Sequence, residues 1–525
     1  MTFAAPPNPL GADLFWWRES ASFHTLVTVY WGFYDPPPEC VTLYCVLFDV
    51  SGAPRASWTV PLEPQAVVVI DSARMDGWTT AASGSGDGVL AIFVCADEAT
   101  REGLKQDYRR LYSMVDWYSD AGDVCGLHND QSFVPGKGGA IELTEIVVRE
   151  TATSANALVF VNGPTAQDSG AVSLTVTNAS GERTSATYAP VMQPFTAHVV
   201  RLVSLFPDLA VFCGDEYATV SGVMTGRDLY LRPYVITEGD HLSAYHGGDL
   251  YQWAPLHPMV YALLGAGEVN PMAVIHRPGE LETTVNLFNT HGDLEDDFWV
   301  DARLYDESGA CVATRERWRL ARRNVLARAD VRELLPDPES PFSGHIALTF
   351  SKVDAAAFPR RLQALLEYRS PVGAARVMAW SDEWNSRMKL FQRSRNESAV
   401  PLRSYYRVWA RDGFSTIVSI TNPGHGDYRE FADYTIRLRN TAGQTRAVSG
   451  TLAPRATRQV RLTTLFDDAV AWLAPTGIGI VEIESTFDLA NVQFVHNARS
   501  GVWAAEHFMA AQTRVGRDTY QPAGS

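Results

Sequence analysis

The chain carries one short motif, Asp or Asn followed three residues later by Gly, at four places about 130 residues apart, which is typical of a tandem repeat. The four glycines are Gly52, Gly181, Gly309 and Gly443. Each follows a strand-like stretch, and glycine is the residue that most easily allows the backbone to turn. We therefore expect one structural module, repeated four times, to account for all 525 residues.

The fourth copy shows the pattern of the module most clearly. Residues 416–422 form a β-branched stretch that ends in Asn-Pro-Gly, and residues 434–439 alternate between apolar and polar side chains. A last pair of strand-like stretches covers residues 479–485 and 491–496. Short strands at such intervals, separated by Gly, Pro and Asn, indicate antiparallel β-sandwiches or small barrels.

The predicted fold class is therefore all-β, with four tandem antiparallel β-sandwich repeats of about 130 residues and few short helices. The two best helical stretches are residues 99–110 and 355–366. The predicted domain boundaries are 1–135, 136–265, 266–395 and 396–525.

Composition limits the possible partners. The hydrophobic fraction of 46% is that of a globular protein, and the net charge of -16 argues against binding to nucleic acid. No apolar run is long enough to span a membrane, and residues 1–10 do not resemble a secretory signal. The six cysteines do not recur at equivalent places, so we expect buried thiols in a reducing compartment. A cytoplasmic location is predicted, with export that needs no N-terminal signal as the alternative.

The sequence contains no catalytic or phosphate-binding motif at the required spacing, so we predict that the protein is not an enzyme and holds no cofactor. The glycine-rich stretches at 83–88 and 135–139 are expected to be flexible turns.

Several histidines lie near carboxylates and are the candidate metal ligands. His and Asp occupy the same loop in two copies, and the second copy ends with another such pair; the candidates are His291, Asp293, His425, Asp427, His246 and Asp249. Asn, Gly and Asp also suit tight loops without any metal, which is the simpler interpretation.

The ends of other copies also bring histidine near carboxylates, namely His128 near Asp130, and Glu506 beside His507. If repeat ends meet, they could share a metal ion. The spacing matches no known zinc pattern, so exposed polar loop residues are the alternative.

Aromatic side chains are more clustered than a core requires, and rings of this kind bind sugars and peptides. The candidate ligand-binding residues are Trp380, Trp384, Tyr234 and Trp253. The alternative, which we prefer, is that the aromatic residues seal the contacts between neighbouring repeats.

The fourth copy has Asn-Pro-Gly-His-Gly-Asp at 422–427 and a proline-to-leucine run at 454–465. In these two stretches it resembles the small soluble transducer domain that partners microbial sensory rhodopsins. This resemblance implies a β-sandwich that assembles as a cyclic tetramer and works by binding a partner, without catalytic residues. Four such modules in one chain would form an intramolecular pseudo-tetramer.

The sequence thus predicts a non-enzymatic binding or scaffold protein, with a signalling adaptor as its specific role. Its repeats are expected to contact one another, and its partner is expected to be a protein or a polymeric ligand. Two alternatives remain open: a carbohydrate-binding or virion or surface structural protein, and a metal-dependent hydrolase with its site between repeat ends.

Overall fold

The four predicted turns share one geometry in the computed structural model. Their glycines have φ angles between 75° and 89°, in the left-handed region that favours glycine. In each turn the side-chain oxygen of the preceding Asp or Asn accepts hydrogen bonds from two later backbone N–H groups. Oδ1 of Asp306, for example, lies 2.9 Å from the backbone nitrogen of Ser308 and 3.1 Å from that of Ala310. The motif therefore encodes an Asx turn that closes a hairpin.

The structure describes residues 9, 11–20, 22–30, 41–63, 65–75, 86–98, 112–128, 138–151, 153–227, 233–239, 241–246, 248–250, 267–268, 272–289, 297–352, 362–381, 402–423, 431–485 and 489–510. We refer to the described residues of 11–128, 138–250, 267–381 and 402–510 as segments one to four.

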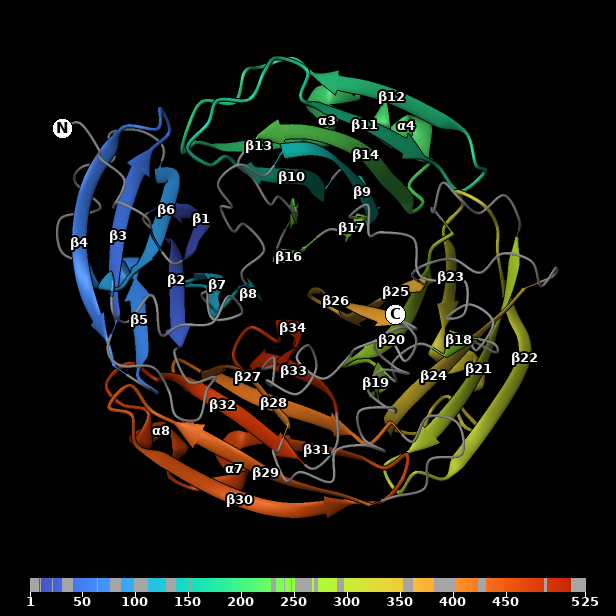
Figure 1. Ribbon diagram of the computed structural model, residues 1–525. Helices are drawn as coiled ribbons and strands as arrows, with labels where there is room; N and C mark the ends of the chain where they lie inside the picture. Colours follow the sequence, from blue (N-terminus) through green and yellow to red (C-terminus); the bar gives the residue numbers. More distant parts are fainter. Residues whose placement is uncertain are drawn as a thin grey trace, which may run out of the picture. The chain divides into compact units, whose positions relative to one another are not determined.

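Each segment contributes two sheets, which gives eight antiparallel sheets among the described residues (Figure 1). In segment one the sheets have the strand orders β1-β6-β3-β4 and β5-β2-β7-β8. The strands are β1 (Gly11–Glu19), β2 (Phe23–Tyr30), β3 (Val41–Asp49), β4 (Pro54–Leu62), β5 (Val67–Asp71), β6 (Gly86–Cys95), β7 (Tyr112–Ser119) and β8 (Val124–His128).

Segment two repeats this order as β12-β11-β14-β9 and β13-β10-β15-β16, with a short strand β17 added beside β9. The strands are β9 (Gly138–Val148), β10 (Ala155–Val161), β11 (Val172–Thr177), β12 (Arg183–Tyr188), β13 (Ala197–Arg201), β14 (Ala218–Arg227), β15 (Tyr234–Glu238), β16 (Leu242–His246) and β17 (Gly248–Leu250).

Segment three has the orders β18-β24-β21-β22, in which β19 also pairs with β24, and β23-β20-β25-β26. The strands are β18 (Gly267–Glu268), β19 (Met272–His276), β20 (Glu282–Leu287), β21 (Phe298–Asp306), β22 (Cys311–Ala321), β23 (Ala327–Asp330), β24 (Phe342–Lys352), β25 (Leu362–Ser370) and β26 (Gly373–Ser381).

Segment four has the orders β30-β29-β32-β27-β35 and β31-β28-β33-β34. The strands are β27 (Leu402–Trp409), β28 (Phe414–Thr421), β29 (Ala432–Arg439), β30 (Thr445–Leu452), β31 (Thr457–Arg461), β32 (Ile478–Ser485), β33 (Ala490–Asn497), β34 (Trp503–His507) and β35 (Met509–Ala510).

The helices of the described residues are all short. They are the 3-10 turns η1 (Ser72–Arg74) and η3 (Val331–Leu334) and the α-helices α3 (Leu202–Leu205), α4 (Leu209–Cys213), α7 (Leu462–Leu465) and α8 (Ala469–Trp472). Together with the sheets, they confirm the predicted all-β sandwich fold with few short helices.

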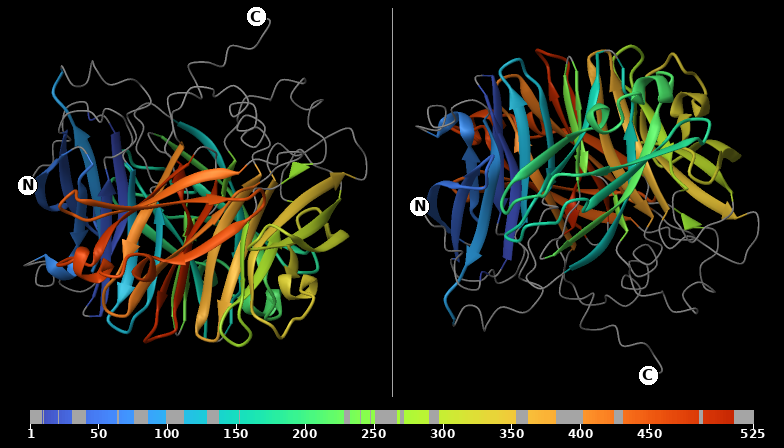
Figure 2. Two further views of the ribbon diagram at one scale, coloured as in Figure 1. Left: turned by 90° about the horizontal axis from the view of Figure 1, so that it is seen from below. Right: turned by 90° about the horizontal axis from the view of Figure 1, so that it is seen from above.

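The two sheets of a segment stack face to face, as Figures 1 and 2 show for segment one. In that segment the indole nitrogen of Trp117 in β7 donates to the carbonyl oxygen of Trp16 in β1, across the two layers, at 3.1 Å. In segment three, Leu304 and Leu348 of one sheet share a core with Val285 and Leu366 of the other. Each such buried aliphatic side chain stabilises the fold by about 1.5–3 kcal/mol.

One predicted helix is partly wrong. Residues 362–366, at the end of the predicted helix 355–366, belong to strand β25, which pairs with β20. Ala364, Leu365 and Leu366 are all buried, and a strand buried on both faces lacks the alternation that distinguishes it from a helix. The remainder of that stretch and the predicted helix at 99–110 lie outside the described residues.

The chain forms two compact units. Unit 1 comprises residues 1–32 and 36–253 and so contains segments one and two; unit 2 comprises residues 33–35 and 254–525 and contains segments three and four. The predicted domain boundaries at 135, 265 and 395 stay predictions.

Candidate functional site

In unit 1 the turn of segment one docks on a loop of segment two. Gly52 lies so close to the backbone of Pro194 that a Cβ on the glycine would be 2.2 Å from the proline oxygen. Beside it the rings of Phe48 and Phe195 stack with centroids 4.3 Å apart and planes inclined by 5°. Phe195 has a φ of 55°, which turns its ring toward the neighbouring segment from a backbone conformation that non-glycine residues rarely adopt. We call this arrangement the turn–loop junction.

Unit 2 contains the same junction. A Cβ on Gly309 would be 2.5 Å from the oxygen of Pro454, and the loop residue Arg455 again has a positive φ, of 61°. Its guanidinium lies over the ring of Tyr305 and donates to the tyrosine hydroxyl. The backbone N–H of Thr457 donates to the oxygen of Glu307 at 3.1 Å. Both units therefore join their segments with a turn glycine, an aromatic residue and a proline loop.

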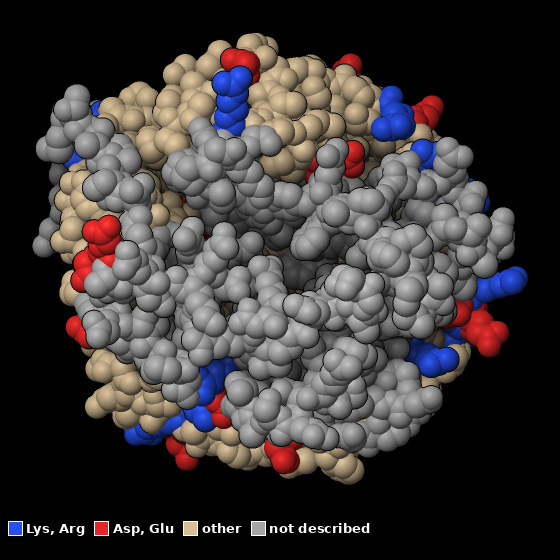
Figure 3. Space-filling model, in the orientation of Figure 1, with Lys and Arg blue, Asp and Glu red and all other residues tan. Residues whose placement is uncertain are grey.

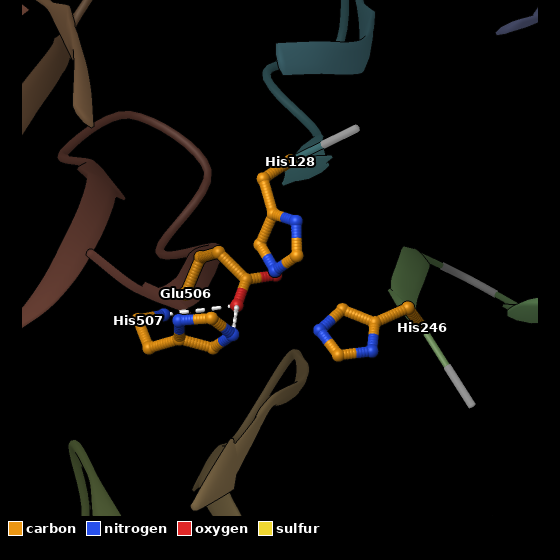
Figure 4. A group of neighbouring side chains, drawn as sticks. All are labelled: His128, His246, Glu506 and His507. Carbon is orange, nitrogen blue, oxygen red and sulfur yellow. Dashed lines mark hydrogen bonds and ion pairs between the residues drawn. The ribbon is translucent and has the colours of Figure 1, made fainter. Parts of the chain in front are cut away.

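A second contact joins the segments of unit 1 along the strands β8 and β16. At the start of the two strands, Nδ1 of His241 lies 2.6 Å from Oδ1 of Asp123. At their ends, the rings of His128 and His246 approach to a centroid distance of 4.8 Å, with planes inclined by 60° (Figure 4). Their exposed fractions are only 6% and 1%. The two segments thus bring together two buried imidazoles at the ends of their last strands.

In unit 2 the corresponding strands β26 and β34 meet through apolar side chains. Ala375 and Val377 of β26 belong to the same buried cluster as Trp503 and Ala505 of β34. The cluster also includes Phe494 in β33, whose ring meets that of Tyr368 edge-on at 4.8 Å.

Strand β34 ends in Glu506 and His507, which interact with each other. Nε2 of His507 lies 3.5 Å from Oε1 of Glu506, and the same carboxylate oxygen accepts the backbone N–H of His507 at 2.9 Å (Figure 4). Glu506 is 3% exposed. The sequence showed histidines near the ends of several repeat copies; in the structure His128, His246 and His507 end the strands β8, β16 and β34.

Unit 2 also holds a buried carboxylate among three arginines. Glu367 in β25 is fully buried, and its oxygens lie 2.8–3.0 Å from nitrogens of Arg328, Arg369 and Arg376. Burial alone would raise the pKa of Glu367, but Arg376, Arg328 and Arg369 outweigh it and hold the pKa well below its usual range. Arg369 lies in β25 with Glu367, and Arg376 lies in the next strand, β26, whereas Arg328 comes from β23, 39 residues before Glu367.

The predicted metal ligands are only partly within the described residues. His246 lies in β16, next to His128, and Asp249 lies in β17, which pairs with β9. His291, Asp293, His425 and Asp427 lie outside the described residues, so the loop sites stay predictions. The sequence places His128 near Asp130 at the end of a repeat copy, but it does not pair His128 with His246.

Of the predicted aromatic ligand residues, Tyr234 is fully buried in unit 1. Its ring meets that of Trp117 edge-on at 5.2 Å, and its hydroxyl donates to the oxygen of Leu14 at 3.3 Å, both in segment one. Tyr234 therefore seals a contact between segments, as the preferred alternative expects. Trp380 lies in β26, and Trp253 and Trp384 lie outside the described residues, so their role in ligand binding stays a prediction.

The described surface carries charges of both signs. On the face drawn in Figure 3, basic and acidic side chains are interspersed among the described residues. Within the described part of the chain, no helix is both long and apolar enough to cross a membrane.

Comparison with known proteins gives no family. No protein-family profile matches the sequence, and no curated protein matches it. Among solved structures, a match is a tetra-tandem repeat in the extending region of a large adhesion protein. It has 10% sequence identity, covers 95% of this chain and 99% of that chain, and has a TM-score of 0.09, which is too low to support an argument about function.

Proposed function

We propose that this protein is a non-enzymatic binding or scaffold protein of the cytoplasm, built from β-sandwich modules that dock through the turn–loop junction. The junction carries the proposal, because unit 1 and unit 2 use the same parts to join their segments. Three thiols, Cys45, Cys213 and Cys311, are free, which supports a reducing compartment. Cys311 is exposed, contrary to the expectation that the cysteines are buried.

Parts of the junction recur in the remaining segments. Segment four has the same turn, and a Cβ on Gly443 would meet nothing within 4 Å. Segments one and three have a positive-φ residue in the corresponding loop, Gln65 with a φ of 63° and Asn324 with a φ of 59°. A turn on one side and a loop on the other make a heterologous contact, which, when it is repeated, gives a ring if the rotation between modules closes and an open array if it does not. These features support the proposed intramolecular pseudo-tetramer.

The test is small-angle X-ray scattering on the full chain, with chromatography and light scattering to establish that it is monomeric. A compact monomer is expected; the scattering profile of an extended rod of four beads would rule the pseudo-tetramer out.

A signalling adaptor is the specific role that we propose, on the basis of the resemblance of residues 422–427 and 454–465 to the sensory rhodopsin transducer. The partner is then a protein. Cross-linking and mass spectrometry in the source cell test this role: recovery of a membrane receptor supports it, and recovery of polysaccharide-binding or capsid components instead would favour the surface or virion alternative.

A metal-dependent hydrolase is the second candidate function, because the ends of segments one and two bring His128 and His246 together. Hydrolysis of ester and phosphoester substrates by the purified protein, lost on chelation, would favour this candidate over the scaffold.

A further inference from the structure

The histidine pair of unit 1 is only half repeated in unit 2. There β34 ends in a histidine, His507, as β16 ends in His246, but β26 contributes the apolar residues Ala375 and Val377 to its contact with β34. The segments of unit 2 are therefore joined without a pair of imidazoles. Two histidines that are 6% and 1% exposed lose more hydration than alanine or valine would, so packing alone does not explain them.

The pair is held in place by its surroundings. His128 and His246 are the last residues of their strands, where β7 and β15 flank them in register with Met114 and Tyr234. At the other end of the same two strands, the 2.6 Å contact between His241 and Asp123 fixes one strand against the other. The imidazoles thus stand on two sheets whose relative position is fixed at a second point, which is the support that a metal site needs.

The distance between the rings suits a shared ion. The coordinating nitrogens of His128 and His246 lie within 4.8 Å of each other. Two imidazole nitrogens that bind one Zn²⁺ ion at about 2.0–2.1 Å in tetrahedral geometry are about 3.3 Å apart, which small rotations of the rings would reach. Imidazole is a ligand of Zn²⁺, Cu²⁺ and Ni²⁺, whereas Ca²⁺ and Mg²⁺ prefer oxygen.

We propose that His128 and His246 together bind a divalent transition-metal ion of the zinc, copper or nickel class. The protein would supply two neutral imidazole nitrogens, and because such an ion takes about four ligands, two positions are left for water or other donors. The ion would clamp segment one to segment two. This inference is independent of the scaffold function, and it revises the expectation that the protein holds no cofactor.

The test is metal binding by the full chain. Protein stripped with a chelator is titrated with Zn²⁺, Cu²⁺ and Ni²⁺ separately by calorimetry, and bound metal is counted after gel filtration by plasma mass spectrometry. One tightly bound ion per chain is expected. His128→Ala and His246→Ala should each weaken metal binding by at least about 10–100-fold. That is the usual loss of affinity when a residue that hydrogen-bonds to a metal ligand is removed, and removing the ligand itself should cost no less.

His198→Ala is the matched control and should bind metal as the wild type does. His198 is also in unit 1, where it interacts with Tyr188 and Thr196. His128→Gln and His246→Gln keep a polar side chain of similar size, and circular dichroism would show that they are folded if the alanine variants are not. X-ray absorption of the metal-loaded protein should show imidazole scattering. No stoichiometric metal in the wild type, or equal affinity in the His128 and His246 variants, would overturn the proposal.

Discussion

Unit 1 and unit 2 have the same strand order and the same turn–loop junction, but they close the second contact between their segments differently. In unit 2 that contact is apolar, with Trp503 and Phe494 in one buried cluster with segment three. In unit 1 it is polar at both ends, with Asp123 and His241 at one end and two histidines at the other. The same topology thus occurs with an apolar contact and with a polar one. The topology therefore dictates the junction but not the polar residues, and those residues indicate a function specific to unit 1.

The largest expected effect is in unit 2. Glu367→Gln leaves three arginines around a neutral, fully buried side chain, so it should lower the free energy of unfolding by about 3–5 kcal/mol. Urea denaturation measures this loss. Glu339→Gln is the control, since Glu339 forms an exposed ion pair with Arg332, and such pairs contribute about 0–1 kcal/mol. Equal losses for the two variants would show that the buried cluster is not a stabilising feature of unit 2.

The junction glycines should give the next largest effect, in both units alike. Gly52→Ala and Gly309→Ala combine an unfavourable φ with a steric clash against a proline carbonyl. Gly443→Ala has the unfavourable φ alone, at a cost of about 1–2 kcal/mol. Each junction variant should therefore be less stable than Gly443→Ala by a further 1–3 kcal/mol or so, as is typical of overpacking. Thermal and urea unfolding of the three variants would compare them; similar losses would mean that the turns are not docked.

The smallest expected effect concerns acid stability. Burial opposes the shift, but hydrogen bonds from Ser308 and Ala310 lower the pKa of Asp306 below its usual value of 3.8. A lowered pKa in the folded state adds stability that is present above that usual value and is lost as the pH falls through the folded value. Asp306→Asn should therefore unfold like the wild type at pH 7, within about 0.5 kcal/mol, and lose less stability between pH 4 and pH 2.

Asn440→Asp is the converse variant, because the turn at 440–443 already uses asparagine as its acceptor. It should gain the pH dependence that Asp306→Asn loses. Urea titrations at a series of pH values measure both, and a steeper acid loss in Asp306→Asn than in the wild type would contradict the assignment.

The sequence predicted the features that depend on local chemistry. The turn glycines, the strands of segment four and the alternation of Tyr434, Ile436 and Leu438 toward the core are all present in the structure. An alternating strand is expected to expose its polar face, but Arg439 at the end of that face is buried. Whether a side chain is buried also depends on the neighbouring strands of the sheet, which the alternation along a single strand does not reveal.

Features that depend on contacts between strands could not be predicted. Residues 362–366 were predicted to be helical because both faces of β25 are buried, so its sequence lacks the alternation that is typical of a strand. Similarly, the pairing of His128 with His246 depends on how β8 and β16 meet, although the histidines themselves were visible in the sequence. Recognising that both residues end the last strand of a segment would have been the one available signal.

Neighbouring segments dock through the turn–loop junction, and a double-mutant cycle on Phe48 and Phe195 tests this docking most directly. The two rings stack at 4.3 Å across the junction of unit 1. Urea unfolding of Phe48→Ala, Phe195→Ala and the double variant should show a coupling energy of about 0.5–1.5 kcal/mol, the usual range for an aromatic pair. If the two losses instead add within about 0.3 kcal/mol, the rings do not interact in solution and the segments do not dock as described.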